Sequence, residues 1–267
     1  MVKWLDIKGR TSLHVNPDDE VAEQRYDAFG KTALWYVAEA GPDAKLFLGF
    51  NRDVTAAEFY EKCQNGTVDE LLNVIKPKVG EHYLVTPGMV HAAENVRLLE
   101  IAECSELWFR LHAWGDEEAE THLEEAFDLI DFKAYRMPAP QGRSEELTEK
   151  IAVTPQFTVS EIRLMNAIHV GAENNGSFLL YACVKGAGSL AVEGMTPVYF
   201  HAGDAILVPA EIQQFTLTPE ARDTLLMEVS VEPRREPDAY IDPNAEPFLK
   251  GEDYDGLEGE ELPDPEL

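Results

Sequence analysis

The sequence has 267 residues, of which 45% are hydrophobic, so it is long and apolar enough to form one large all-β domain or two small barrels. Its formal net charge of -28 argues against nucleic acid and anionic membranes as partners, and an anionic ligand would need a local cluster of Lys and Arg. Because the chain lacks both a long apolar run and the apolar stretch of a signal peptide, we expect a cytoplasmic protein.

The elements predicted along the chain are mostly short strands. Apolar or alternating runs separated by Gly, Pro and Asp indicate strands at residues 32–38, 45–50, 83–85, 96–101, 177–184, 198–200, 205–208 and 215–217. Helical periodicity occurs only in 55–74, where Thr55 is a candidate N-cap with Glu58 three residues later, and in 116–130. The pattern predicts an all-β protein, a double jelly roll with a few short helices.

The chain divides into four predicted segments. Residues 1–135 are expected to form the first barrel, with a small helical insertion and the candidate active site. Residues 136–150, rich in Pro, Gly and Ser, are predicted as a linker, and 151–235 as a second, degenerate barrel. Residues 236–267 are predicted to be an acidic C-terminal tail that is solvated and disordered.

An internal repeat supports the two barrels. The first half contains Gly80-Glu81 followed by Pro87-Gly88-Met89-Val90-His91, and the second contains Gly203-Asp204 followed by Pro209-Ala210-Glu211 and then Gln214. Both copies resemble the second cupin motif, in which a His points into the barrel from the strand after the turn. Because Gln214 stands where the His would fall, we expect chemistry only in the first barrel and no metal in the second.

The candidate metal ligands are His14, Asn16 and His91. His14 and Asn16 are two residues apart, so on a strand their side chains face the same way, and His91 comes from a distant strand. Imidazole nitrogens with an amide oxygen can bind a divalent metal, although three ligands without a carboxylate hold it weakly. A hydrogen-bonded polar interior without metal is the alternative, and the residues leave both readings open.

Several segments resemble the class I mannose-6-phosphate isomerases, in the family's order. They are Ser12-Leu13-His14-Val15-Asn16-Pro17, Gly30-Lys31-Thr32-Ala33-Leu34-Trp35-Tyr36, Pro87-Gly88-Met89-Val90-His91-Ala92, Leu99-Glu100-Ile101 and Arg110-Leu111-His112-Ala113-Trp114-Gly115. The resemblance covers roughly residues 2 to 230. It implies a bicupin fold and a metal-dependent aldose-ketose isomerase that interconverts mannose 6-phosphate and fructose 6-phosphate in carbohydrate metabolism.

The resemblance also shows where the metal set departs from the family. Family members hold zinc with a Gln, a His, a Glu and a second His, and those positions are here His14, Asn16, Ala33 and His91. Ala33 removes the sole carboxylate, which lowers the stabilisation of a divalent cation. We therefore expect zinc or another divalent metal to be bound weakly or to be absent.

The positions that the family uses around its substrate are retained. Ser12 and Lys31 match positions that contact the phosphate, whereas Glu100 in the active cleft and Arg110 beside the reacting carbons are the candidate catalytic residues. Two structural alternatives remain: Glu100 would pair with Arg110, and Lys31 in its turn would be solvated. The expected partner is a small-molecule sugar phosphate.

Competing functions remain open from the sequence. The first is mannose-6-phosphate isomerisation, and the alternative is a non-catalytic sugar-phosphate-binding cupin or degenerate paralogue with an altered or absent metal site. A cupin that uses His14, Asn16 and His91 to hold a metal for another sugar is the third. The chain also begins later than family members do, so we expect an exposed edge that a homodimer or another chain would cover.

Overall fold

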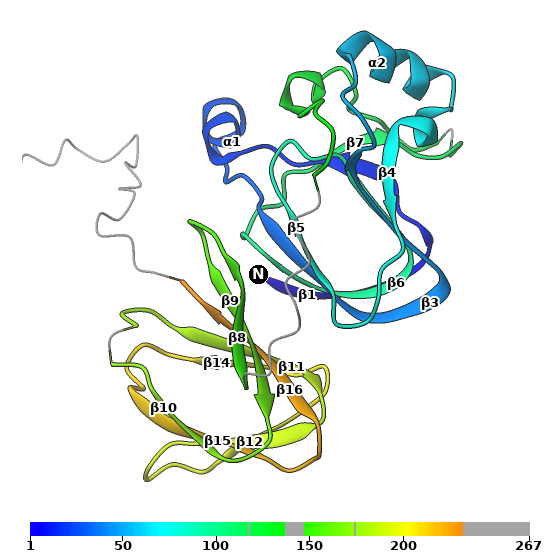
Figure 1. Ribbon diagram of the computed structural model, residues 1–267. Helices are drawn as coiled ribbons and strands as arrows, with labels where there is room; N and C mark the ends of the chain where they lie inside the picture. Colours follow the sequence, from blue (N-terminus) through cyan, green and yellow to red (C-terminus); the bar gives the residue numbers. More distant parts are fainter. Residues whose placement is uncertain (117, 137–146, 174, 232–267) are drawn as a thin grey trace, which may run out of the picture. The chain divides into compact units, whose positions relative to one another are not determined.

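The computed structural model describes residues 1–116, 118–136, 147–173 and 175–231 (Figure 1). The predicted acidic tail and residues 137–146 of the predicted linker therefore lie outside the described residues. No helix in the described ranges is long and apolar enough to cross a membrane.

Seven strands between Val2 and His112 pair into one sheet that curves around the first barrel (Figure 1). They are β1 (Val2–Arg10), β2 (Leu13–Val15), β3 (Ala33–Phe50), β4 (Leu72–Ile75), β5 (His82–Val85), β6 (His91–Ala102) and β7 (Phe109–His112). Their order is β4-β3-β6-β2-β7, with β1 paired to β6 and β5 paired to β3. This order places the short β2 between β6 and β7, which matters for the candidate site.

The predicted strands at 32–38 and 45–50 are one continuous strand, β3. Residues 41–43, Gly-Pro-Asp, favour a break, but β3 instead shifts its register against β6 between Val37 and Glu39 and between Ala40 and Lys45. Bulges of this kind absorb extra residues without ending the pairing. The turn signal was therefore wrongly taken as the end of a strand.

The helical predictions are partly confirmed. Thr55 caps α2 (Ala56–Gln64), and its side chain accepts a hydrogen bond from the Glu58 amide at 3.2 Å. The predicted helix of 55–74 is too long, because Gly66 adopts a positive φ of 69° after the helix and the remainder forms η1 (Val68–Leu71) and β4. Such a φ favours glycine and ends a helix.

The predicted helix at 116–130 is wrong, and one helix was missed. In 116–130 the described residues form turns and only the short η2 (Phe127–Leu129), since the dense acidic side chains of this segment repel each other on a helix surface. The missed helix is α1 (Asp19–Tyr26), which is mostly polar and gives no clear periodic signal. The Asp18 side chain caps it by accepting from the Val21 amide at 2.8 Å.

Nine strands after Thr148 form the second barrel from two sheets, ordered β10-β15-β12-β13 and β14-β11-β16-β9-β8. They are β8 (Thr148–Val153), β9 (Thr158–Leu164), β10 (Ile168–Gly171), β11 (Leu179–Lys185), β12 (Ala187–Ala191), β13 (Val198–His201), β14 (Ala205–Val208), β15 (Gln214–Pro219) and β16 (Thr224–Ser230). Leu190, Phe200, Phe215 and Leu217 are among the buried side chains between them. The all-β prediction is confirmed.

The internal repeat has a similar strand arrangement in both copies. Gly80 and Gly203 adopt positive φ values of 89° and 99°, each before the strand that the motif predicts, β5 and β14. His91 then opens β6 and Gln214 opens β15. The Gln214 side chain is exposed and donates to Glu173 at 2.7 Å.

Candidate functional site

A row of polar residues crosses three neighbouring strands of the first barrel. His14 on β2 lies opposite His91 on β6 and, on its other side, opposite Arg110 on β7. Residues directly opposite one another on neighbouring strands point to the same face of the sheet. The imidazole rings of His14 and His91 are accordingly 6.2 Å apart between centroids, with their planes inclined by 56°.

Both imidazoles lie in surroundings that oppose a positive charge. His91 is 7% exposed, its Nδ1 lies 2.9 Å from the Met89 carbonyl oxygen, and burial lowers its pKa to about 4. The pKa of His14 is lowered to about 3. Burial is the largest cause, and the nearby His91, Arg110 and Lys31 lower the pKa further. Both rings are therefore neutral at neutral pH, and the Nε2 atom of His14 is buried without a hydrogen-bond partner.

Glu100 forms the second part of the site, and its partners differ from the sequence-based alternatives. Lys31 Nζ lies 3.2 Å from Glu100 Oε1, and Trp35 Nε1 on β3 donates to Glu100 Oε2 at 2.9 Å. Glu100 thus pairs with Lys31 rather than with Arg110. Lys31 is not solvated either, because its side chain is only 13% exposed.

The turn before β3 holds Lys31 in this position. The Lys31 amide donates to the Pro17 carbonyl at 3.1 Å, and the Gly30 amide donates to Asp19 Oδ1 at 2.9 Å. A Cβ at Gly30 would lie 2.4 Å from the Asp18 carbonyl carbon, so no larger residue fits without moving the backbone. Gly30 therefore fixes the approach of the turn to the start of α1.

Arg110 lies among groups that sequence reasoning did not assign to the site. Its Nη1 donates to the Glu120 carbonyl at 3.0 Å, its backbone amide donates to His122 Nδ1 at 3.3 Å, and its Nε is buried without a partner. The guanidinium carbon lies 5.3 Å from the centre of the Trp108 ring, and that ring meets His14 edge-on at 4.8 Å. Trp108 and His122 were missed, although Trp108 stands two residues before Arg110, a spacing that puts both on one face of an extended chain.

The other predicted residues are less closely engaged. Ser12 is half-buried in the segment before β2, and no hydrogen bond joins it to Lys31 among the described residues. Asn16 is 2% exposed directly after β2, and its carbonyl accepts from the Gly88 amide at 3.0 Å. Ala33 is 1% exposed on β3 between Val85 and Ala102, in an apolar cluster.

These residues do not fit the zinc set that the sequence resemblance implies. Within the described ranges, no group of three or more His, Cys, Asp and Glu side chains is arranged to hold a metal. Ala33 supplies no oxygen ligand, and the carboxylate of Glu100 already pairs with Lys31. The charged groups around His14 are cationic, which disfavours a further cation. The metal roles of His14, Asn16 and His91 remain predictions.

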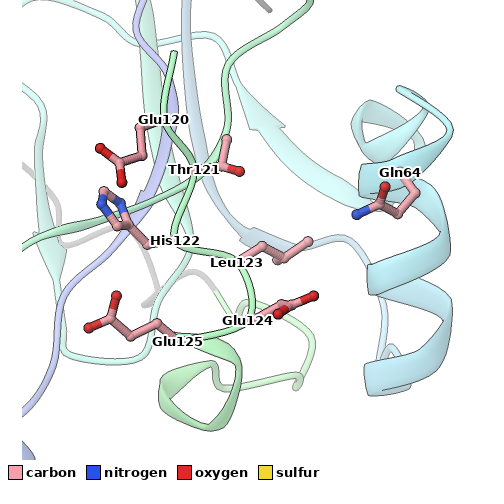
Figure 2. Close-up of a pocket in the computed structure, with 7 residues that line it drawn as sticks. All are labelled: Gln64, Glu120, Thr121, His122, Leu123, Glu124 and Glu125. Atoms are coloured by element: carbon pink, nitrogen blue, oxygen red, sulfur yellow. The ribbon is translucent and has the colours of Figure 1, made fainter. Parts of the chain in front are cut away.

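A hollow of about 310 Å³ lies beside the site rather than on it. It is lined by Gln64 of α2 and by the loop residues 120–125, and in Figure 2 Leu123 and Glu124 extend from the loop toward that helix. None of the predicted site residues lines it, although Glu120 and His122 also contact Arg110. Its three glutamates make it unsuitable for a phosphate group.

Comparison with known proteins agrees with this architecture. A family model described as the cupin domain of mannose-6-phosphate isomerase matches residues 148–223. Mannose-6-phosphate isomerase ManA from Bacillus subtilis is 28% identical over 227 residues, which are 81% of this chain and 71% of that protein. The mannose-6-phosphate isomerase of Streptococcus mutans is 24% identical over 80% of this chain and 69% of its own length.

Solved structures show the same fold. The mannose 6-phosphate isomerase from Bacillus subtilis superposes with a TM-score of 0.74 at 23% identity, covering 86% of this chain and 74% of that chain. A putative mannosephosphate isomerase from Archaeoglobus fulgidus gives a TM-score of 0.71 at 22% identity, covering 87% and 71%. The double jelly roll is thereby confirmed, and in sequence the chain is similar to the mannose-6-phosphate isomerases.

Proposed function

We propose that the first barrel binds mannose 6-phosphate or a closely related sugar phosphate and isomerises it slowly at most. The observation that carries the proposal is the convergence of Lys31 and Arg110 around the neutral pair His14 and His91. In a chain with a net charge of -28, Arg110 and Lys31, the latter balanced by Glu100 until a ligand competes for it, provide the cationic groups that an anionic sugar requires. The names of its relatives identify mannose 6-phosphate as the first ligand to test.

The phosphate is expected to bind at Lys31. The ammonium group lies 3.2 Å from Glu100 and is fixed by the Gly30 turn, so it is positioned before a ligand arrives. A phosphate must compete with Glu100 for that ammonium group. This competition favours an affinity in the micromolar to millimolar range rather than tighter binding.

The remaining groups support binding better than turnover. Isomerisation moves a proton between neighbouring carbons and develops negative charge on the sugar oxygens, which Arg110 is suited to stabilise. The family's metal supplies several kcal/mol of such stabilisation, and the donor set here does not fit it. Losing that stabilisation corresponds to turnover at least about 100-fold below that of a typical isomerase.

Isothermal titration calorimetry with mannose 6-phosphate tests the proposal. We expect saturable binding by the unmodified chain and an affinity at least about 10-fold weaker in Lys31→Met, since one charge-assisted contact is lost. Lys185→Met is the matched control, because Lys185 is exposed on the second barrel and pairs with exposed Asp223. Absence of binding, or equal losses in both variants, would contradict the proposal.

A further inference from the structure

Two polar atoms in the first barrel lack the hydrogen bonds that burial demands. Within the described ranges, the buried side-chain nitrogen and oxygen atoms without a partner are His14 Nε2 and Arg110 Nε. The two residues are direct neighbours across β2 and β7. Buried polar groups are almost always paired, so these two adjacent exceptions mark a place where a water molecule or a ligand group can complete them.

Trp108 lies against both residues. Its ring meets His14 edge-on at 4.8 Å and lies 5.3 Å from the Arg110 guanidinium carbon. Trp108 is nevertheless 44% exposed, so part of a large aromatic surface remains available to a ligand. A sugar ring presents hydroxyl groups at its edge and C–H groups on its faces, which match two unpartnered polar atoms beside an aromatic surface.

We propose, resting on the sugar-phosphate function above, that His14, Arg110 and Trp108 bind the sugar ring directly. Arg110 Nε donates a hydrogen bond to a ring hydroxyl, His14 Nε2 hydrogen-bonds a hydroxyl, and Trp108 packs against a C–H face of the ring. His14 then contacts the sugar itself at a position where the family resemblance implies a metal ligand. Trp108 is the residue through which this chain distinguishes a sugar ring from other phosphate compounds.

This assignment separates the sugar contacts from the phosphate contact. Lys31 pairs with Glu100, whereas His14, Arg110 and Trp108 contact one another through their rings and backbone register. Substituting Lys31 should therefore affect only ligands that carry a phosphate. Substituting Trp108 or His14 should affect mannose 6-phosphate and unphosphorylated mannose alike.

The test is calorimetry with the full chain after EDTA treatment, using mannose 6-phosphate, mannose and inorganic phosphate as ligands. We expect Trp108→Ala and His14→Ala to lower the affinity for both sugars by about 10-fold or more. Trp108→Phe should keep most of the affinity. Lys31→Met should weaken the binding of mannose 6-phosphate and of phosphate but not the binding of mannose. Tyr199→Ala and His201→Ala, an aromatic and a histidine that are 61% and 74% exposed on the second barrel, should stay within about two-fold.

The outcomes distinguish the two proposals. If mannose 6-phosphate binds but neither Trp108→Ala nor His14→Ala weakens it, the inference is wrong and the sugar-phosphate function stands. If binding appears only after zinc is added, the direct contact of His14 with the sugar is wrong. If the unmodified chain binds none of the three ligands under either condition, the proposed function itself fails. Trp108→Ala keeps the test valid should His14→Ala not fold, because the large exposed fraction of Trp108 makes its substitution tolerable.

Discussion

Lys31 and Glu100 form a largely enclosed ion pair, with 3.2 Å between Nζ and Oε1 and side chains that are 13% and 9% exposed. Removing one partner of such a pair leaves an uncompensated charge in a region of low dielectric, where Trp35 supplies Glu100 with one remaining hydrogen bond. The pair therefore links the stability of the first barrel to the site that is proposed to bind phosphate.

We predict that Lys31→Met lowers the free energy of unfolding by about 3 kcal/mol, within the stability of an ordinary domain. Urea denaturation followed by circular dichroism measures the change. The double variant Lys31→Met with Glu100→Gln should regain part of the loss, because the carboxylate charge is gone. If the free energy of unfolding of Lys31→Met lies within about 0.5 kcal/mol of that of the unmodified chain, the ion pair contributes as little as an exposed one.

Gly30→Ala should impair both stability and ligand binding. The added Cβ would lie 2.4 Å from the Asp18 carbonyl carbon and 2.5 Å from the Asp19 amide nitrogen, so the turn must move and Lys31 with it. We expect mannose 6-phosphate to bind several-fold more weakly and the melting temperature to fall. Gly41→Ala is the control, since a Cβ there meets no atom within 4 Å. Equal melting temperatures in the two variants would contradict this account of the turn.

The three cysteines should differ in reactivity. Burial raises the pKa of the Cys63 thiol to about 12. It is also the main reason why the pKa of Cys183 is raised to about 11, whereas Cys104 is exposed. Because the thiolate is the reactive form, Cys63 and Cys183 stay protonated and unreactive from pH 7 to about pH 9. Iodoacetamide labelling read by peptide mass spectrometry should modify Cys104 alone until urea is added. Rapid labelling of Cys63 in the folded chain would contradict its burial.

Restoring the family's ligands should create metal dependence. We predict that zinc stabilises the triple variant His14→Gln, Asn16→His and Ala33→Glu and that EDTA reverses this effect. Zinc at 100 times its dissociation constant should raise the free energy of unfolding by about 2.7 kcal/mol. The melting temperature of the unmodified chain should change little under the same conditions. His14→Gln with Asn16→His is the control that still lacks the carboxylate. A strong zinc response in the unmodified chain would show that the present donors suffice.

Local signals in the sequence predicted local features well. The run 205–208 is β14 with the same bounds, and the Thr55 cap is present, because a short apolar run and a capping side chain depend only on neighbouring residues. In the segment of the second helix prediction, where acidic side chains already oppose a helix, Leu123 and Ala126 are buried in a core cluster from turns. Tertiary packing there outweighed the periodic pattern.

The site was only partly predictable for a related reason. His14 and His91 were grouped as candidate ligands from their spacing and residue types, but their contact depends on the register of β2 against β6, which no local pattern encodes. The ion pair of Lys31 with Glu100 was missed because it joins a turn to a distant strand. Trp108 precedes its short strand and reads as an ordinary apolar residue until β7 places Arg110 beside His14.

The most direct test of the central claim measures binding and turnover of mannose 6-phosphate on the same EDTA-treated preparation, by calorimetry and by a coupled assay for fructose 6-phosphate. We predict saturable binding in the micromolar to millimolar range with turnover at least about 100-fold below a typical isomerase, the difference expected when several kcal/mol of transition-state stabilisation are missing. Turnover at the full rate of an isomerase, or no binding of the sugar phosphate, would contradict the account.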